Sequence, residues 1–163
     1  MNDLVVGRRA AIGFGRTWPC SIGRSGRTTR KHEGDHATPT GELGIVACYY
    51  RPDRMVKPAP WAIPLRKDDI WCDDPSHPHY NHISKSPMTH SHEKMWRADP
   101  LYDVVLTTNW NWPNADPGKG SAIFMHRWRK RGHPTEGCIA FDLGDLLKLA
   151  RFLEPGSKIF VKP

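Results

Sequence analysis

The sequence predicts a mainly β domain with a single helix near its C-terminal end. Short runs of apolar and β-branched residues, separated by turns that contain Gly and Arg, fill most of the first 50 residues and are typical of hairpin strands. One segment close to the C-terminus has the apolar spacing of an amphipathic helix. With 163 residues the chain suits one domain, residues 1–163, that buries a core without disulfides or a metal.

The expected strands are placed by their residue types and by the turns between them. In the N-terminal third they are "DLVV" (3–6), "AAIGF" (10–14), "WPCSIG" (18–23) and "GIVACYY" (44–50). Further on, "YDVVLTT" (102–108) and "SAIFM" (121–125) are the expected central strands, and "KIFV" (158–161) is the last. A polar loop, "KHEGDHATPTGEL" (31–43), separates the first three strands from the fourth.

The helix is expected directly after Asp142, whose side chain is suited to cap an N-terminus. Asp145 follows three residues later, which favours the same helix start. The apolar face consists of Leu143, Leu146, Leu147, Ala150 and Leu153. The Glu-Pro-Gly segment at 154–156 then ends the helix.

Residues 51–100 differ from the rest of the chain. They are rich in Pro, Trp, His and Asp and follow neither the strand period nor the helix period. Their aromatic content is too high for a disordered linker. We therefore interpret them as a long, irregular but ordered connection and expect that it can act as a lid.

Charge and cysteine content limit the compartment and the partners. The formal net charge of +7 suits an anionic partner, and no apolar run approaches the ~20 residues that a membrane span needs. The N-terminal segment has no apolar signal-peptide region, and the four cysteines show no Cys-x-x-Cys spacing, which favours reduced thiols. We expect a cytoplasmic protein, or one of the periplasm or cell envelope if an export signal was removed.

Cys138 is the candidate nucleophile. Gly137 precedes it, and the pair lies on a turn ahead of the helix cap, where the amide groups of both residues can point at one developing oxyanion. The alternative is that Cys138 is an inert, buried apolar residue, as lone cysteines commonly are.

Two histidines compete as its general base. His126 ends the expected strand at 121–125, so a rigid element positions it, and residues 127–137 are long enough to return the chain to the cysteine. His133 lies in a loop next to Pro134, where its orientation is less fixed. We predict that His126 is the base.

Basic residues surround this pair in the sequence. They are Arg127, Arg129, Lys130 and Arg131. Their positive potential would favour a thiolate over a thiol; alternatively, they form an exposed loop whose charges only increase solubility.

Several motifs are similar to those of a known family. "FMH" followed by "TEGCIAF" resembles the active-site signature of the L,D-transpeptidase catalytic domain (YkuD type), and "GDHATPTGEL" resembles its Thr-Pro-Thr-Gly-Glu motif. "WCDDPSHPHYN", "SHEKMWRADPLYDVV" and "GKGSAIFMH" are similar to a short subgroup without a signal peptide, and the resemblance spans residues 3–162. It implies a β-sandwich of mixed sheets with one C-terminal helix following the catalytic cysteine.

The resemblance also assigns roles to individual residues. Cys138 becomes the nucleophile and His126 the base, the backbone amides of Gly137 and Cys138 form the oxyanion hole, and the carbonyl of Arg127 orients the imidazole. Thr135 matches the Ser/Thr of the motif. The substrate-side candidates are Thr135, His92, Tyr80, Asn81 and Arg131.

This chain departs from the family pattern in two places. Many members have an arginine two residues after the cysteine, where this chain has Ala140, and the loop from the histidine to the cysteine is shorter than in most members. Both departures concern the substrate cleft more than the chemistry.

The resemblance implies cysteine-dependent acyl transfer on peptidoglycan tetrapeptide stems. The bond between the L-centre of a diamino acid and D-Ala is cleaved through a thioester. Water as acceptor gives an L,D-carboxypeptidase for muropeptide recycling, and an amine gives an L,D-transpeptidase; both acceptors stay open. The expected partners are a stem peptide or muropeptide and a carbapenem that acylates Cys138, with no cofactor.

Two other function classes remain open. The His-x-His pairs in "HPHYNH" (77–82) and "THSHE" (89–93) suggest a zinc peptidase, although we expect no metal. The seven tryptophans and the basic surplus suggest a nucleic-acid or glycan-binding module with an inert cysteine. We expect no nucleic-acid partner, because the surplus charge equally attracts carboxylate-bearing peptides.

Overall fold

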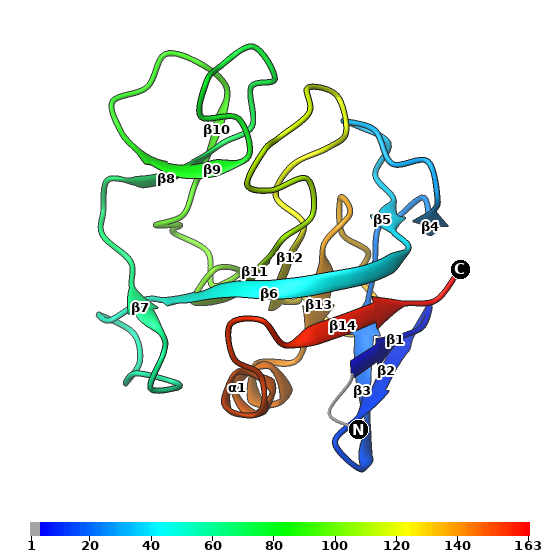
Figure 1. Cartoon of the computed structure of the whole chain (residues 1–163). Helices are drawn as coiled ribbons and strands as arrows, with labels where there is room; N and C mark the ends of the chain where they lie inside the picture. Colours follow the sequence, from blue (N-terminus) through cyan, green and yellow to red (C-terminus); the bar gives the residue numbers. More distant parts are fainter. Residues whose placement is uncertain (1–3) are drawn as a thin grey trace.

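A computed structural model describes residues 4–163 (Figure 1). The first residue of the predicted strand 3–6 therefore lies outside the described part of the chain. The strands are β1 (Leu4–Val6), β2 (Ala10–Gly13), β3 (Arg16–Ser21), β4 (Arg27–Thr28), β5 (Thr38–Pro39), β6 (Gly41–Tyr50), β7 (Ile63–Pro64), β8 (Asp69–Cys72), β9 (His82–Lys85), β10 (His92–Lys94), β11 (Val104–Thr108), β12 (Phe124–Arg127), β13 (Ile139–Phe141) and β14 (Lys158–Val161), with the helix α1 (Leu143–Phe152) between the last two. The predicted mainly β fold with one C-terminal helix is confirmed.

Nine strands form the main sheet, in the order β11-β12-β13-β3-β2-β1-β14-β6-β7. The sheet is mixed, as predicted, because β1–β14, β12–β13 and β6–β7 pair in parallel and the other neighbours antiparallel. The long strand β6 pairs with β14 through its first residues and with β11 through its last ones. This second pairing brings β11 back to β6 and folds the sheet around the core (Figure 1).

The main core lies between the inner face of this sheet and the helix. Strand residues such as Leu4, Trp18 and Leu43 are fully buried there together with Leu146 and Leu149 of α1. Apolar burial of this kind contributes roughly 1.5–3 kcal/mol for each large side chain. As the sequence predicts, the side chain of Asp142 caps α1 by accepting a 2.8 Å hydrogen bond from the amide of Gly144.

Residues 51–100 contain more regular structure than the sequence predicts. They contain β7 and a separate three-stranded antiparallel sheet of order β10-β8-β9, which lies at the opposite end of the molecule from α1 (Figure 1). Sequence alternation could not reveal it, because the three strands span three or four residues each and all four residues of β8 are buried. Lid motion of this region stays a prediction.

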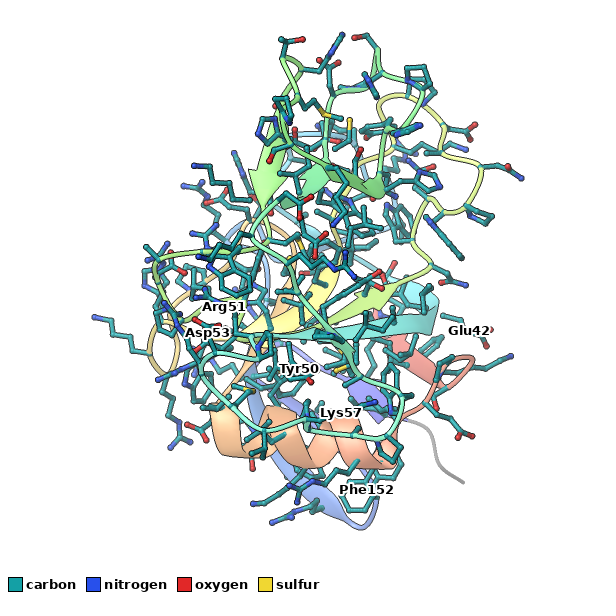
Figure 2. The ribbon with its side chains drawn as sticks, turned by 90° about the vertical axis from the view of Figure 1, so that its left-hand side faces the viewer. Glu42, Tyr50, Arg51, Asp53, Lys57 and Phe152 are labelled. Carbon is teal, nitrogen blue, oxygen red and sulfur yellow. The ribbon has the colours of Figure 1, made fainter. Side chains whose placement is uncertain are left out.

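Arg51 joins the start of this region to its end. The guanidinium forms two 2.8 Å hydrogen bonds with the carboxylate of Asp53, which lies beside it in Figure 2. It also lies 4.0 Å from the ring centre of Trp96 and donates to the carbonyl of Arg97. Because Arg51 directly follows β6 and residues 96 and 97 lie between β10 and β11, this contact joins the two ends of the region beside the main sheet.

Candidate active site

The two central strands place the predicted nucleophile and base on the same face of the sheet. Strands β12 and β13 run parallel, with His126 opposite Ala140 and Met125 opposite Ile139. Because side chains alternate along a strand, Cys138 and His126 share one face while Met125 and Ile139 point into the main core. Both site residues line one cavity of about 440 Å³.

His126 is held with one ring nitrogen free to act as a base. Its Nδ1 lies 2.7 Å from the carbonyl oxygen of Arg127, which can only accept, so Nδ1 carries the proton and Nε2 is the basic atom. The orienting role of this carbonyl therefore fits the geometry. Burial lowers the pKa of His126 from 6.5 to about 4, despite the opposing effect of the Arg127 hydrogen bond, so the ring is neutral near pH 7.

The thiol of Cys138 is held between two backbone groups. Its Sγ donates to the carbonyl of Ala122 at 3.1 Å and accepts from the amide of Phe124 at 3.5 Å. Burial raises the pKa of Cys138 to about 12, and the amide of Phe124 opposes that rise only in part. The resting pair is thus a neutral thiol beside a neutral imidazole.

The basic loop after His126 does not activate the cysteine as expected. Among charged groups, Lys31 lowers the pKa of Cys138, whereas Glu93 and Glu136 raise it, and burial outweighs them all. The prediction that the arginines of residues 127–131 favour a resting thiolate is therefore wrong. The thiol must lose its proton during attack rather than before it.

Ala122 owes its position to Asn81. The backbone of Ala122 has φ of 53°, a left-handed conformation that a non-glycine residue adopts only when its surroundings hold it. The side-chain oxygen of Asn81 accepts from the amide of Ala122 at 2.9 Å and from the indole of Trp71 at 3.1 Å. Asn81 is 2 % exposed and outside the cavity lining, so it positions the acceptor of the thiol rather than contacting substrate as predicted.

Thr135 shapes the turn that carries the cysteine. Its hydroxyl donates to the carbonyl of Cys138 at 2.6 Å and accepts from the amide of Gly137 at 3.1 Å. Gly137 has φ of 139°, and a Cβ there would come within 3.0 Å of the carbonyl of Ala37, so only glycine fits. The Gly137 amide predicted for the oxyanion hole is therefore already bonded in the resting structure, and its role in the oxyanion hole stays a prediction.

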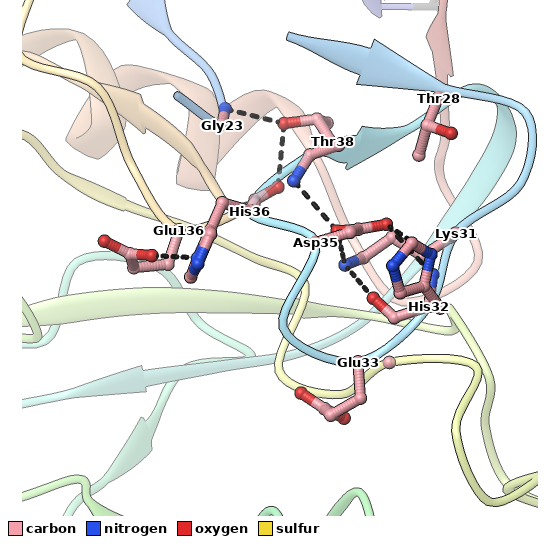
Figure 3. Close-up of polar contacts among 12 residues, drawn as sticks. Gly23, Thr28, Lys31, His32, Glu33, Asp35, His36, Thr38 and Glu136 are labelled. Carbon is pink, nitrogen blue, oxygen red and sulfur yellow. Dashed lines mark hydrogen bonds and ion pairs between the residues drawn. The ribbon is translucent and has the colours of Figure 1, made fainter. Parts of the chain in front are cut away.

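Thr38 holds the same turn from the other side, and sequence reasoning did not assign it a role. Its hydroxyl donates to the carbonyl of Gly137 at 2.8 Å and accepts from the amide of Gly23 at 2.9 Å. The second of these bonds is drawn in Figure 3. Thr38 is the first residue of the Thr-Pro-Thr-Gly motif, so the motif could have indicated a role for this residue. The motif does not reveal which atoms the hydroxyl of Thr38 binds.

The cavity wall opposite the turn is acidic and aromatic. Glu93, at the middle of β10, accepts a 2.7 Å hydrogen bond from the hydroxyl of Tyr102, whose ring stands edge-on to His126 at 5.5 Å. Burial raises the pKa of both Glu93 and Tyr102. Sequence reasoning assigned no role to Tyr102. Asp73, Glu33, Lys31, Arg97 and Arg129 also line the cavity.

Three predicted substrate-side residues lie away from this cavity. Tyr80 donates a 2.5 Å hydrogen bond to Glu33, which lines the cavity, but Tyr80 itself does not line it. The ring of His92 is within 2.7 Å of the carbonyl of His90, also outside the lining. Arg131 lines a different cavity. Of the predicted set, Thr135 lines the catalytic cavity, and the competing histidine, His133, reaches its rim.

The His-x-His pairs do not assemble into a ligand set. Within residues 4–163, no group of three or more His, Cys, Asp or Glu residues is arranged to hold a metal ion. The rings of His77, His79 and His90 contact one another instead, and His77 Nδ1 accepts from the amide of His79 at 3.0 Å. Across the same residues, none of the helical structure is long and apolar enough to cross a membrane.

Comparison with known proteins places the chain in a family. The model of the YkuD family, the L,D-transpeptidase catalytic domain, matches residues 14–161. No curated protein matches the chain. The crystal structure of Mycobacterium tuberculosis L,D-transpeptidase 1 is similar at 14 % identity with a TM-score of 0.41; the match covers 98 % of this chain and 60 % of that one. The chain belongs to the YkuD family of L,D-transpeptidase catalytic domains.

Proposed function

We propose that this protein is a cysteine acyltransferase for peptidoglycan tetrapeptide stems that cleaves the bond between the L-centre of a diamino acid and D-Ala. One observation carries the proposal: Cys138 and His126 share a face of the central strands and line one cavity, with Nδ1 of His126 fixed on the carbonyl of Arg127. Family membership supports the same chemistry.

The first half-reaction follows from the neutral resting pair. As Sγ of Cys138 attacks the peptide carbonyl, Nε2 of His126 takes the thiol proton, and the carbonyl oxygen becomes the oxyanion of a tetrahedral intermediate. When this intermediate collapses, the C–N bond breaks, His126 returns the proton to the leaving amine, and D-Ala departs. A thioester on Cys138 remains.

Of the two predicted oxyanion donors, we favour the amide of Cys138. The amide of Gly137 must first leave the hydroxyl of Thr135, to which it is bonded. Each backbone donor to an oxyanion is typically worth about 10²–10³ in turnover. We therefore assign the main stabilisation to the amide of Cys138, with Gly137 joining only if Thr135 releases it.

For the second half-reaction we propose water as the acceptor, which makes the protein an L,D-carboxypeptidase of muropeptide recycling. A cavity of about 440 Å³ lies near the lower end of the roughly 300–1,000 Å³ range of ligand pockets and suits one bound stem better than two. All four cysteines are free, which supports a reducing compartment such as the cytoplasm. An amine acceptor, and with it L,D-transpeptidation, is the alternative.

Mass spectrometry of products tests the function and the acceptor together. Purified protein is incubated with a tetrapeptide stem, with and without an excess of a second D-amino acid. We expect tripeptide plus D-Ala in both mixtures, and no product from the Cys138→Ala variant. Exchange product exceeding tripeptide would reject hydrolysis but keep the acyltransferase, whereas no product in either mixture would reject both.

Two reagents separate this proposal from a zinc peptidase or a binding module. A carbapenem is expected to add its full mass to Cys138 and to leave the Cys138→Ala variant unmodified. EDTA is expected to leave turnover unchanged, while thiol alkylation abolishes it. Turnover that survives alkylation but not EDTA would favour the zinc alternative.

A further inference from the structure

A second cavity, of about 530 Å³, lies on the other side of the loop that leads to Cys138. Its walls are the β1–β2 turn, the end of β3 and residues 128–134. It shares Trp128 and Pro134 with the catalytic cavity, so the same loop separates the two. We propose that this second cavity, the arginine cavity, binds a phosphate or diphosphate group.

The charge of the arginine cavity is strongly one-sided. Four arginines line it, namely Arg8, Arg9, Arg24 and Arg131, and no acidic residue does. In the part of the chain that the structure describes, no carboxylate pairs with Arg8, Arg9 or Arg131, whereas Arg24 is paired with Glu136. The cavity lining therefore carries three arginine charges that no carboxylate of the described residues neutralises.

A buried hydroxyl supplies the second observation. Ser21 is 4 % exposed and lines the arginine cavity, and its Oγ has no hydrogen-bond partner in the structure. Because Trp18 and Cys20 of the same strand face the core, Ser21 points to the other face, next to Ala140 in the register. A buried hydroxyl without a partner is energetically unfavourable, and a bound acceptor would remove that cost.

The ligand class follows from the number and type of donors. A guanidinium donates in a planar fork that matches two oxygens of a phosphate, and its charge is retained at any working pH. Three unpaired charges exceed what a single carboxylate neutralises but match the two or three negative charges of a phosphate monoester or diphosphate. The hydroxyl of Ser21 adds a donor for one further oxygen.

The location allows two sources of such a group. A phosphate carried by the substrate can occupy the arginine cavity while its peptide reaches Cys138, because both cavities share Trp128 and Pro134. Alternatively, a free phosphate or pyrophosphate ion binds there. Both share the same recognition chemistry.

Calorimetric titration with inorganic pyrophosphate tests the site without requiring turnover, so its result is independent of the proposed function. At constant ionic strength we expect saturable binding of one ion. Binding should weaken at least tenfold in the Arg8→Gln/Arg9→Gln variant and several-fold in Ser21→Ala. The matched control, Arg66→Gln, removes an exposed arginine outside both cavities and should bind like the parent.

Absence of saturable binding, or an equal loss in the Arg66→Gln control, would overturn the proposal. Arg8 and Arg9 are exposed, so their substitution leaves the core intact, and a thermal melt verifies folding. Kinetics then distinguish the sources. A lower KM for a tetrapeptide linked to a sugar diphosphate than for the free peptide, lost in the double variant, assigns a substrate-borne group; pyrophosphate altering turnover of the free peptide assigns a free ion.

Discussion

The hydroxyl of Thr38 donates a 2.8 Å hydrogen bond to the carbonyl of Gly137, although 99 positions of the chain separate the two residues. The same hydroxyl accepts from the amide of Gly23. One buried side chain thereby ties the polar loop at 31–43 and the end of β3 to the turn of the nucleophile. This hydrogen bond connects the Thr-Pro-Thr-Gly block directly to the Gly-Cys block.

Thr38→Val should destabilise the protein. Valine has nearly the shape of threonine but leaves the amide of Gly23 and the carbonyl of Gly137 without their partner. Each buried polar group that loses its partner costs about 1–3 kcal/mol, so we expect a loss of about 2–4 kcal/mol in the free energy of unfolding, measured in urea. Thr38→Ser keeps the hydroxyl, so its free energy of unfolding should fall far less. An equal loss in both variants would contradict a stabilising role of the two hydrogen bonds.

Thr135→Ala should lower kcat more than it changes KM. The substitution removes the donor to the carbonyl of Cys138 and frees the amide of Gly137, so the turn loses its fixed geometry. We expect kcat to fall about tenfold, because the lost orientation of Cys138 outweighs the gain of the freed Gly137 amide as an oxyanion donor. Thr135→Ser retains both bonds and should stay within about twofold of the parent. A rise of KM alone in Thr135→Ala would instead indicate a direct substrate contact.

Much of the fold could be predicted because its strands carry strong local signals. The run at 158–161 is a strand with the predicted bounds, and Asp142 caps the helix as expected. The run at 121–125 shows the limit. The strand there is Phe124–Arg127, because Ala122 takes a left-handed conformation held by Asn81. No local pattern reports a contact made 41 positions away.

The site could be predicted as far as its motifs reach. Cys138, His126 and the carbonyl of Arg127 lie as expected, since they are close in sequence and on paired strands. The protonation state of the Cys138 thiol could not be predicted, because burial sets its pKa and burial depends on the tertiary structure. Tyr102 was also missed, since its closeness to His126 arises only when β11 pairs with β12.

The rate should persist to unusually low pH. Neutral His126 is the active base, and burial lowers its pKa from 6.5 to about 4. Below pH 6 an ordinary histidine is mostly protonated, whereas His126 stays mostly neutral down to about pH 5. We therefore expect the acid limb of kcat/KM to fall near pH 4 rather than pH 6.5. A half-maximal rate at pH 6.5 would contradict the effect of burial.

The free energy of unfolding should also depend on the protonation of His126. The unfolded chain binds a proton at His126 near pH 6.5, whereas the folded protein does so only near pH 4. The contribution of neutral His126 to the free energy of unfolding is therefore complete above pH 6.5. It is lost as pH falls toward 4, by up to about 3 kcal/mol. Denaturation in urea at pH 7 and pH 4.5 measures this loss, and His126→Gln should reduce it.

Tyr102 should act on His126 through its ring rather than through its hydroxyl. The edge of the ring meets the imidazole, while the hydroxyl points to Glu93. Tyr102→Phe keeps the ring, so we expect kcat to change by less than about threefold. Tyr102→Leu removes the aromatic edge while retaining apolar volume, and we expect kcat to fall about tenfold, because His126 loses one of the contacts that fix its plane.

The hydroxyl of Tyr102 has a separate, measurable consequence. It lowers the pKa of Glu93, which burial raises, so in Tyr102→Phe that pKa should rise further. The carboxylate signal of Glu93 in NMR titration of the two proteins measures this shift. Tyr80→Phe is the matched control, because it removes a hydroxyl bonded to Glu33 instead. If Tyr80→Phe moved the Glu93 titration as far as Tyr102→Phe, the hydrogen bond from Tyr102 would not be the cause of the shift. If Tyr102→Phe lowered kcat as much as Tyr102→Leu, a positioning role of the ring would be ruled out.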